Sequence, residues 1–400
     1  MIYCPAWRNI WRNKLRSGII MGAIAIGMFA GTLLVAFLKG WSTDIIQEHI
    51  DMQVSCIQIH RHDDGAENDA SNFFAEEEVV QVLETTPGIT GFSTRLKADA
   101  VLTSPEESTG VTLIGVDSEM EKKISRVYTT IPDSAGSFLS HSEVSPIVIS
   151  RETADRLKVR LRSKIVLNVQ DCSGEIQSTL FRVGGIFATH SKRFDAVTAY
   201  VRKSDLAPYL MTPEGCVHEI AVMTAEPKKS DEQARRLSQR LPSMLKAESW
   251  GEVFPVLNVG LFWLKVFSYL FLGVFLTALS FGTVNIMQMA VMERDKEFKM
   301  LYRIGMAPRL ILKMVLLETC FLTLVGAIVG IVPATVLAAL TADVGLNISM
   351  LFNLKFAYGF GEVVHPELSV VAIVEIFILV AVSATVSAIL PMHHTLKIMK

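Results

Sequence analysis

The stretch "ERDKEFKMLYRIG", residues 293–305, decides how the rest of this chain is organised. It carries seven charged residues and follows directly on Val266–Met292, twenty-seven residues without a charge. A helix of that length, at about 1.5 Å per residue, measures roughly 40 Å and exceeds the ~30 Å hydrocarbon layer of a membrane. No glycine or proline separates the two segments. The sequence therefore predicts a stiff membrane helix that passes without a pause into a short charged helix.

Three further segments are long and apolar enough to cross a bilayer. They are Gly18–Leu38, Thr319–Ala342 and Leu368–Pro391, the last interrupted only by Glu375. Only a helix satisfies its own backbone polar groups inside lipid. The first segment is too long for the core of a cleavable signal peptide, and no small-residue cleavage site follows it. We therefore expect a polytopic α-helical membrane protein with four transmembrane helices.

Lysine and arginine indicate which side of the membrane each connection occupies. They gather before the first span and between the second and third, at Arg8, Arg12, Lys14, Arg16, Arg294, Lys296, Lys299, Arg303, Arg309 and Lys313. The connection 343–367 holds only Lys355 against three acids. Cytoplasmic connections are enriched in lysine and arginine, so both termini and residues 293–313 are expected in the cytoplasm.

The resulting organisation has nine parts. "PAWRNIWRNKLR", residues 5–16, has the pattern of an amphipathic helix in the membrane interface, with Trp7 and Trp11 on its apolar side. The expected order is a cytoplasmic interfacial helix at 1–17, a span at 18–38, an extracytoplasmic α+β domain at 39–258, a span with a stalk at 259–292, a coupling-helix loop at 293–313, a span at 314–342, an extracytoplasmic loop at 343–367, a span at 368–391 and a cytoplasmic tail at 392–400.

Short β-branched or alternating runs predict the strands of the external domain. They lie at 54–60, 110–117, 145–150, 164–170, 179–187, 196–201 and 218–225, with helical patterns at 76–83, 151–157 and 230–241. This mixture indicates an α+β domain rather than a nucleotide-binding βαβ fold. No G-x-x-x-x-G-K-[ST] phosphate loop occurs in the chain, so we expect it to bind no ATP by that route.

The charged helix carries a narrow apolar stripe. Phe298, Leu301, Tyr302 and Gly305 recur at i, i+3, i+4 and i+7, and Asp295 and Lys299 form a favourable i,i+4 pair on the charged side. A helix with one apolar and one charged face can dock on a soluble partner. It can equally be a solvated connector between two spans, and the pattern leaves both interpretations open.

Small residues and acids inside the spans indicate helix contacts. We expect helix packing at three G-x-x-x-G pairs, which are Gly18 with Gly22, Gly27 with Gly31, and Gly326 with Gly330. Glu318 and Glu375 are intramembrane acids that must face protein or water. A proton or substrate pathway through Glu375 and a protonated carboxyl hydrogen-bonded within the bundle both remain open. No spacing identifies a catalytic, cofactor-binding or metal site, and residues 60–64 and 393–394 lack a closed set of metal ligands.

These residues resemble the FtsX-like or MacB-like permeases of ABC transporters. "NIMQMAVMERDKEFKMLYRIG" is similar to that family's coupling segment, at Arg294, Glu297, Phe298, Leu301 and Gly305. "LLETCFLTLVGAIVG" is similar to its third span, at Glu318, Gly326 and Gly330. "KGWSTDIIQEHI" and "SWGEVFPVL" resemble the segments that flank the external domain of the lipoprotein-releasing (LolC/LolE-type) permeases.

The resemblance implies a permease subunit that is not itself an enzyme. Its expected partners are an ABC ATPase dimer that binds ATP and Mg²⁺, a second permease chain of the same or a related sequence, membrane lipids and a periplasmic carrier or adaptor, but no nucleic acid. The expected ATPase-coupling interface comprises Glu293, Arg294, Glu297, Phe298, Leu301, Arg303 and Gly305. The implied function is release of lipoproteins or similar lipid-anchored cargo from the bacterial inner membrane. Efflux of a peptide or macrolide with an outer adaptor, and a non-transporting scaffold that activates a cell-wall hydrolase, are the alternatives.

Overall fold

The computed structural model describes residues 14–61, 71–140, 144–189, 191–347 and 363–398. The expected interfacial helix with Trp7 and Trp11, residues 62–64 and most of the 343–367 connection lie outside these ranges. The chain divides into two compact units. The helix unit comprises Met1–Asp44, Gly260–Ile348 and Val363–Lys400, and the sheet unit comprises Ile45–Val259 and Ser349–Glu362.

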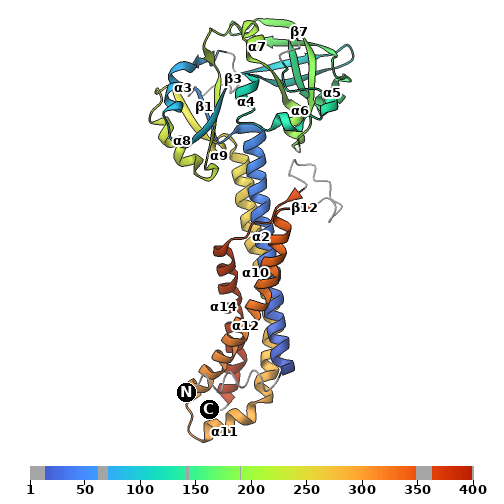
Figure 1. The fold of residues 1–400 in the computed structure, drawn as a ribbon. Helices are drawn as coiled ribbons and strands as arrows, with labels where there is room; N and C mark the ends of the chain where they lie inside the picture. The colour runs from blue at the N-terminus through green and yellow to red at the C-terminus, as the bar shows by residue number, and fades with distance from the viewer. Residues whose placement is uncertain (1–13, 62–70, 141–143, 190, 348–362, 399–400) are drawn as a thin grey trace. The chain divides into compact units, whose positions relative to one another are not determined.

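The described residues of the helix unit form four long helices and one short helix (Figure 1). The long ones are α2 (Lys14–His49), α10 (Pro255–Glu293), α12 (Pro308–Ala342) and α14 (Val370–Ile398), and the short one is α11 (Asp295–Arg303). A two-stranded ribbon, β12 (Leu346–Asn347) with β13 (Val363–Val364), connects α12 to α14. The tail expected at 392–400 continues α14 as far as Ile398.

Among the described residues, four helical segments are long and apolar enough to cross a membrane. They are Ser17–Val54, Pro255–Ile286, Arg309–Ala342 and Val370–Ser387. Each overlaps one of the four spans that the sequence predicts. Which side of a membrane each connection occupies stays a prediction.

The helices pack through a core drawn from every helix of the helix unit. Ile24 and Met28 of α2, Leu272 of α10, Val315 of α12 and Ile376 of α14 are among its buried residues. Buried polar side chains also lie in these helices, among them Thr32, Thr319, Thr323, Ser387 and the ion pair described below. The core therefore places the connection between α10 and α12 against the bundle.

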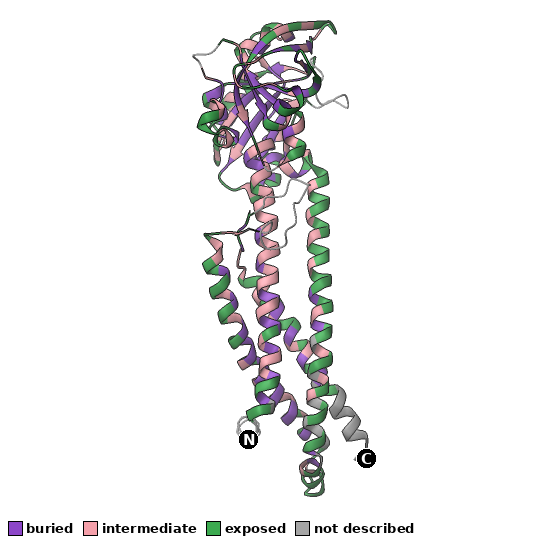
Figure 2. Ribbon diagram, turned by 90° about the vertical axis from the view of Figure 1, so that its right-hand side faces the viewer, coloured by how far each residue is buried: buried purple, intermediate pink, exposed green. Residues whose placement is uncertain are grey.

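The sheet unit is built on one nine-stranded sheet in the order β11-β1-β10-β3-β4-β8-β5-β7-β6. Figure 2 shows that its buried residues concentrate along these strands. The strands are β1 (Ile57–Arg61), β3 (Ile89–Thr103), β4 (Ser108–Val116), β5 (Pro146–Ser150), β6 (Lys164–Gln170), β7 (Ile176–Phe187), β8 (Thr198–Arg202), β10 (Glu219–Thr224) and β11 (Leu245–Ser249). Short strands β2 (Phe74–Ala75) and β9 (Cys216–Val217) pair separately.

In the described part of the sheet unit, seven α-helices accompany the strands, so the unit is α+β as the sequence predicts. They are α3 (Glu76–Glu84), α4 (Ser118–Glu121), α5 (Arg151–Leu157), α6 (Lys192–Val197), α7 (Lys203–Leu210), α8 (Ser230–Ser238) and α9 (Trp250–Val253). One buried cluster lies between α8 and the strands β1, β10 and β11. A second lies among β3 to β8.

Strand β3 takes part in both the open and the closed part of the sheet. Its first half pairs with β10 as far as Arg95, and its second half pairs with β4 and, at Ala100–Thr103, with β6. The last pairing closes β3, β4, β8, β5, β7 and β6 into a barrel, because β6 is otherwise the end of the sheet. Closure removes exposed strand edges. β3 therefore joins an open sheet to a closed barrel.

Four charged side chains cluster at β3, of which three are buried and the fourth, Lys97, is half-buried. The Arg95 guanidinium donates to Glu219 Oε1 at 3.0 Å and to Glu121 Oε2 at 3.2 Å, and Lys97 pairs with Glu219. The side chain of Arg95 is 2% exposed and that of Glu219 is 4% exposed. Burial by itself raises the pKa of Glu219, but Lys97 and Arg95 outweigh it and hold this pKa below its ordinary value of 4.5.

We expect the sheet unit to lose stability as pH falls below 4.5, the ordinary pKa of glutamate. A lowered pKa in the folded state means that the carboxylate stabilises the fold above the unfolded pKa, and that protonation removes this contribution. The loss of stability can be measured by hydrogen exchange of the backbone amides of β3 and β10 as the pH is lowered through 4.5. Glu219→Gln should flatten the pH dependence, whereas Glu77→Gln, an exposed control, should leave it unchanged. If the stability of both variants fell equally steeply with pH, Glu219 would not be the group that causes the pH dependence.

The ion-pair clamp that holds helix α11

A single residue, Arg294, separates α10 from α11. Its backbone (φ −98°, ψ 8°) is not that of an α-helix, so the apolar helix ends at Glu293 and α11 starts anew at Asp295. This corrects the expectation of an unbroken passage from the long helix into the charged one. At this break the side chain of Arg294 turns inward and pairs with Glu318 of α12.

Arg294 is held by three neighbours. Its Nη1 donates to Glu318 Oε2 of α12 at 2.9 Å, and its Nε donates to Glu297 Oε2 at 3.1 Å. Its guanidinium carbon lies 5.2 Å from the centre of the Phe298 ring, within the range of a cation–π contact. The side chains of Arg294 and Glu318 are 9% and 7% exposed. We call Arg294, Glu297, Phe298 and Glu318 the clamp.

Phe298 is part of the helix core and not of a docking face. It is 1% exposed and packs in the same cluster as Ile20, Ile311 and Met314. Leu301 is half-buried against that cluster. The family resemblance implies that Arg294, Phe298 and Leu301 belong to an interface with a partner, whereas in this structure their side chains face this chain's own helices. An apolar stripe has the same spacing whether it faces a partner or its own bundle.

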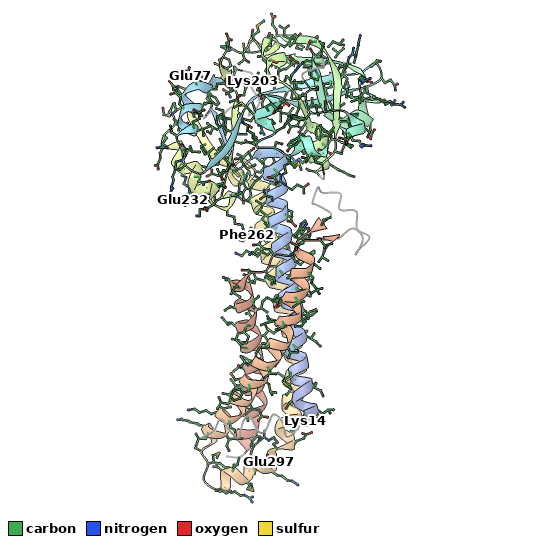
Figure 3. All side chains as sticks on the ribbon, in the orientation of Figure 1. Lys14, Glu77, Lys203, Glu232, Phe262 and Glu297 are labelled. Carbon is green, nitrogen blue, oxygen red and sulfur yellow. The ribbon has the colours of Figure 1, made fainter. Side chains whose placement is uncertain are left out.

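The opposite side of α11 is open. Met300 is 57% exposed and Ile304, just after the helix, is 75% exposed. Lys296 and Arg303 are exposed on the same side, at i−4 and i+3 from Met300, and Tyr302 is 40% exposed. Glu293 and Gly305 are exposed as well, and Glu297 is half-exposed (Figure 3). We call Lys296, Met300, Arg303 and Ile304 the outer face of α11.

Sequence reasoning did not single out Met300 and Ile304. Both lie among charged residues, outside the stripe of Phe298 and Leu301. Their spacing of four residues was nevertheless a signal, because two apolar side chains at i and i+4 lie on one face of a helix. Once the main stripe is buried, this pair becomes the apolar part of the exposed surface.

The predicted packing glycines behave in two ways. A Cβ added at Gly330 would lie 2.3 Å from the carbonyl oxygen of Ala25, and one at Gly326 would lie 2.9 Å from that of Met21, so α2 and α12 meet backbone to backbone there. Gly31 faces Ile376 of α14, and Gly27 is buried. Among the described residues, nothing lies within 4 Å of a Cβ added at Gly18 or Gly22.

Polar contacts connect α10 with α14. Tyr269 OH donates to Glu375 Oε2 at 3.1 Å, and the hydroxyls of Ser280 and Ser383 are hydrogen-bonded to each other. Glu375 therefore has a hydrogen-bond donor within the bundle, as one of the two sequence interpretations requires. Within the described part of the chain, no three His, Cys, Asp or Glu side chains gather as metal ligands would.

Comparison with known proteins supports this description. Residues 17–240 match the family described as the MacB-like periplasmic core domain, and residues 269–399 match the family described as the FtsX-like permease C-terminal region. The first match covers more than half of the chain, and the two together cover most of it. The chain belongs to the FtsX-like permeases that carry a MacB-like periplasmic core domain, which are membrane subunits of ABC-type transporters. Permeases of this family work with ABC ATPase partners that are separate chains.

Three solved structures are similar to parts of the chain. The extracellular domain of the noncanonic ABC-type transporter YknZ from Gram-positive bacteria is 17% identical, with 48% of this chain and 99% of that one covered and a TM-score of 0.33. The periplasmic region of MacB from Actinobacillus actinomycetemcomitans is 12% identical, with 54% and 98% covered and a TM-score of 0.35. A domain of a putative permease protein from Porphyromonas gingivalis is 13% identical, with 50% and 89% covered and a TM-score of 0.28. A search of curated proteins found no match.

Proposed function

We propose that α11 couples this permease to a separate ABC ATPase and that the clamp holds α11 in position for it. The observation that carries the proposal is the burial of the Arg294–Glu318 ion pair, at 2.9 Å, between α12 and the start of a nine-residue helix. A short helix that is fixed on one face and exposes Met300 and Ile304 on the other suits docking in a groove of a folded partner. The outer face also carries Lys296 and Arg303, so its partner groove is expected to be acidic at the rim.

The proposal places α11 and both termini in the cytoplasm and the sheet unit outside a bacterial inner membrane. The excess of lysine and arginine around α11 supports this orientation. Helix α10 has 39 residues, which at about 1.5 Å each span roughly 60 Å, twice the ~30 Å hydrocarbon layer. Such a helix can cross the membrane and continue beyond it. ATP and Mg²⁺ are bound by an ATPase dimer, and a second permease chain, of the same or a related sequence, completes the transporter.

The proposed cargo is a lipoprotein, or a similar lipid-anchored molecule, in the outer leaflet of the inner membrane. Two observations support a cargo of this kind. The segments that flank the external domain resemble those of lipoprotein-releasing permeases. In addition, the sheet unit is a large folded insertion between the first two apolar helices, which suits cargo handling better than a simple activating contact. A periplasmic carrier then receives the released lipoprotein.

Depletion of the chain from cells, followed by membrane fractionation, tests the proposed cargo. Lipoproteins should accumulate in the inner membrane and return to normal sorting when the wild-type chain is restored. Normal lipoprotein sorting with increased sensitivity to a peptide or macrolide would favour efflux through an outer adaptor. Normal sorting with a loss of cell-wall hydrolase activity would favour the signalling scaffold.

A further inference from the structure

We propose that residues Val363–Glu367 form a strap that fastens the start of α14 to one face of α2, with Glu367 as its positioning residue. The strap makes α2 and α14 move together during transport. This consequence rests on the proposed function. The geometry rests only on contacts inside the helix unit.

Glu367 contacts α2 through its side chain and its backbone. Its carboxylate accepts hydrogen bonds from Lys39 Nζ at 2.8 Å and from Thr43 Oγ1 at 2.7 Å. Its backbone N–H donates to the carbonyl oxygen of Ala36 at 3.0 Å. Positions 36, 39 and 43 are three and four residues apart and therefore lie on one face of the helix. A single residue of the strap thus spans two turns of α2.

His365 extends this contact along the same face. Its backbone N–H donates to Asp44 Oδ2 at 2.8 Å, and its ring Nδ1 lies 3.2 Å from the same oxygen. Asp44 follows Thr43 and lies four residues beyond Gly40. The strap therefore runs along α2 from Ala36 to Asp44.

Gly40 lets the strap approach the helix backbone. A Cβ at this position would lie 2.0 Å from the carbonyl oxygen of His365 and 2.9 Å from the backbone nitrogen of Glu367. No side chain fits such a space, so only glycine allows this approach. The contact is between two backbones, which cannot move aside as a flexible side chain can. Gly40 is therefore the position at which the strap is most sensitive to substitution.

The strap is also fixed at its other end. Val363 and Val364 pair with Asn347 and Leu346 of the strand that follows α12. Helix α14 begins at Val370, three residues after Glu367. Three residues span at most about 10 Å, so a shift of α2 that carries Glu367 must carry the start of α14 as well.

The ion pair alone does not explain the attachment. The side chains of Lys39 and Glu367 are 36% and 34% exposed, and an ion pair with that access to water contributes little by itself. The backbone hydrogen bond to Ala36 and the close backbone contact at Gly40 fix the position of the strap on α2, which the ion pair alone does not do. Loss of the fit at Gly40 should therefore have a larger effect than loss of the charge on Lys39.

Chemical crosslinking of the natural residues tests whether the strap stays closed. A carbodiimide joins a lysine to a touching carboxylate, so the Lys39–Glu367 crosslink can be measured by mass spectrometry in the complete transporter in nanodiscs. We expect the same yield, within about twofold, without nucleotide and in an ATP-trapped state. A fall of about tenfold in either state would show that the strap opens and would overturn the proposal. The same crosslink can be measured in the permease alone, without an ATPase. The strap can therefore be confirmed or rejected even if the proposed coupling to an ATPase is wrong.

Substitutions test what the strap does. Gly40→Ala should lower cargo release per ATP hydrolysed about tenfold while hydrolysis continues, whereas Gly282→Ala, in a helix with nothing within 4 Å of the new Cβ, should not. Glu367→Lys should reduce release, and Lys39→Glu together with Glu367→Lys should restore most of it, because the swap rebuilds the pair. If Gly40→Ala fails to fold, the charge swap still tests the positioning role of Glu367. Equal release by the Gly40 and Gly282 variants, or a failure of the charge swap to rescue, would overturn the positioning role.

Discussion

Replacing Arg294 with methionine is expected to destabilise the helix unit by roughly 3–5 kcal/mol and to release α11 from α12. The substitution removes the cation that faces Glu318 and leaves a carboxylate with a 7% exposed side chain among apolar helices. A buried charge that loses its closest opposite charge costs far more than the pair contributes in total. Thermal unfolding in nanodiscs measures the stability, and limited proteolysis at residues 293–306 measures the release of α11.

Two matched variants make this prediction specific. Arg303→Met removes an exposed arginine from the same helix, and its effect on stability should stay within about 0.5 kcal/mol. Arg294→Met combined with Glu318→Met should recover much of the loss, because a buried ion pair replaced by apolar side chains is often neutral. A single Arg294→Met variant that unfolds like the wild type, with α11 still protected, would disprove the role of the clamp.

Aspartate at both Met300 and Ile304 is expected to weaken ATPase binding by about a hundredfold or more. These side chains are 57% and 75% exposed, so the substitutions leave the fold of the chain intact. In an interface, a few buried apolar anchors carry most of the binding free energy, at ~2 kcal/mol or more each. The measurement is the dissociation constant of the ATPase for the permease in nanodiscs, with ATP hydrolysis as a second readout.

The control for this prediction lies in the sheet unit. Ile176 is 74% exposed, nearly the same as Ile304, so Ile176→Asp makes the same chemical change at a similar exposure. It should leave ATPase binding unchanged. If the Met300 and Ile304 variant binds the ATPase as tightly as the Ile176 variant does, the outer face of α11 is not the docking surface.

Together these two predictions separate the two sides of one short helix. Substitutions in the clamp lower the stability of the helix unit, and they weaken coupling because α11 is then no longer held in place. Substitutions of the outer face change coupling and leave stability unchanged. A coupling defect by itself would not distinguish these cases, so both measurements are needed on each variant. Phe298 is 1% exposed in the helix core, so Phe298→Asp is expected to disrupt folding as well as coupling.

Much of the secondary structure could be predicted because its pattern is local. Runs of about twenty apolar residues predict long helices wherever they occur, and four such helices are present in the described chain. The strands β5 and β6 lie within one residue of their predicted ranges, as do the helices α3 and α5. In each case the residues that determine the helix or strand lie within it or next to it in the sequence.

The longest strand was missed for a physical reason. β3 alternates as expected on its inner face, with Leu96, Ala98, Ala100 and Leu102 buried, but alanine is a weak strand signal and Arg95 and Lys97 interrupt the apolar pattern. Arg95 is buried only because Glu121 and Glu219 meet it from elsewhere in the fold. A buried arginine that depends on partners 26 and 124 residues away leaves no local pattern to find.

Sequence by itself determined which segments become long apolar helices, that the intervening domain mixes helices and strands, and that a short amphipathic helix lies within residues 293–305. These properties depend on composition and on the period of side chains along the chain. Only the tertiary structure decided which side of α11 is buried, that Arg294 is paired with Glu318, that the sheet closes through β3 and β6, and that residues 363–367 lie along α2. These depend on pairs of residues far apart in the chain, and a linear pattern does not record which distant partner a side chain meets.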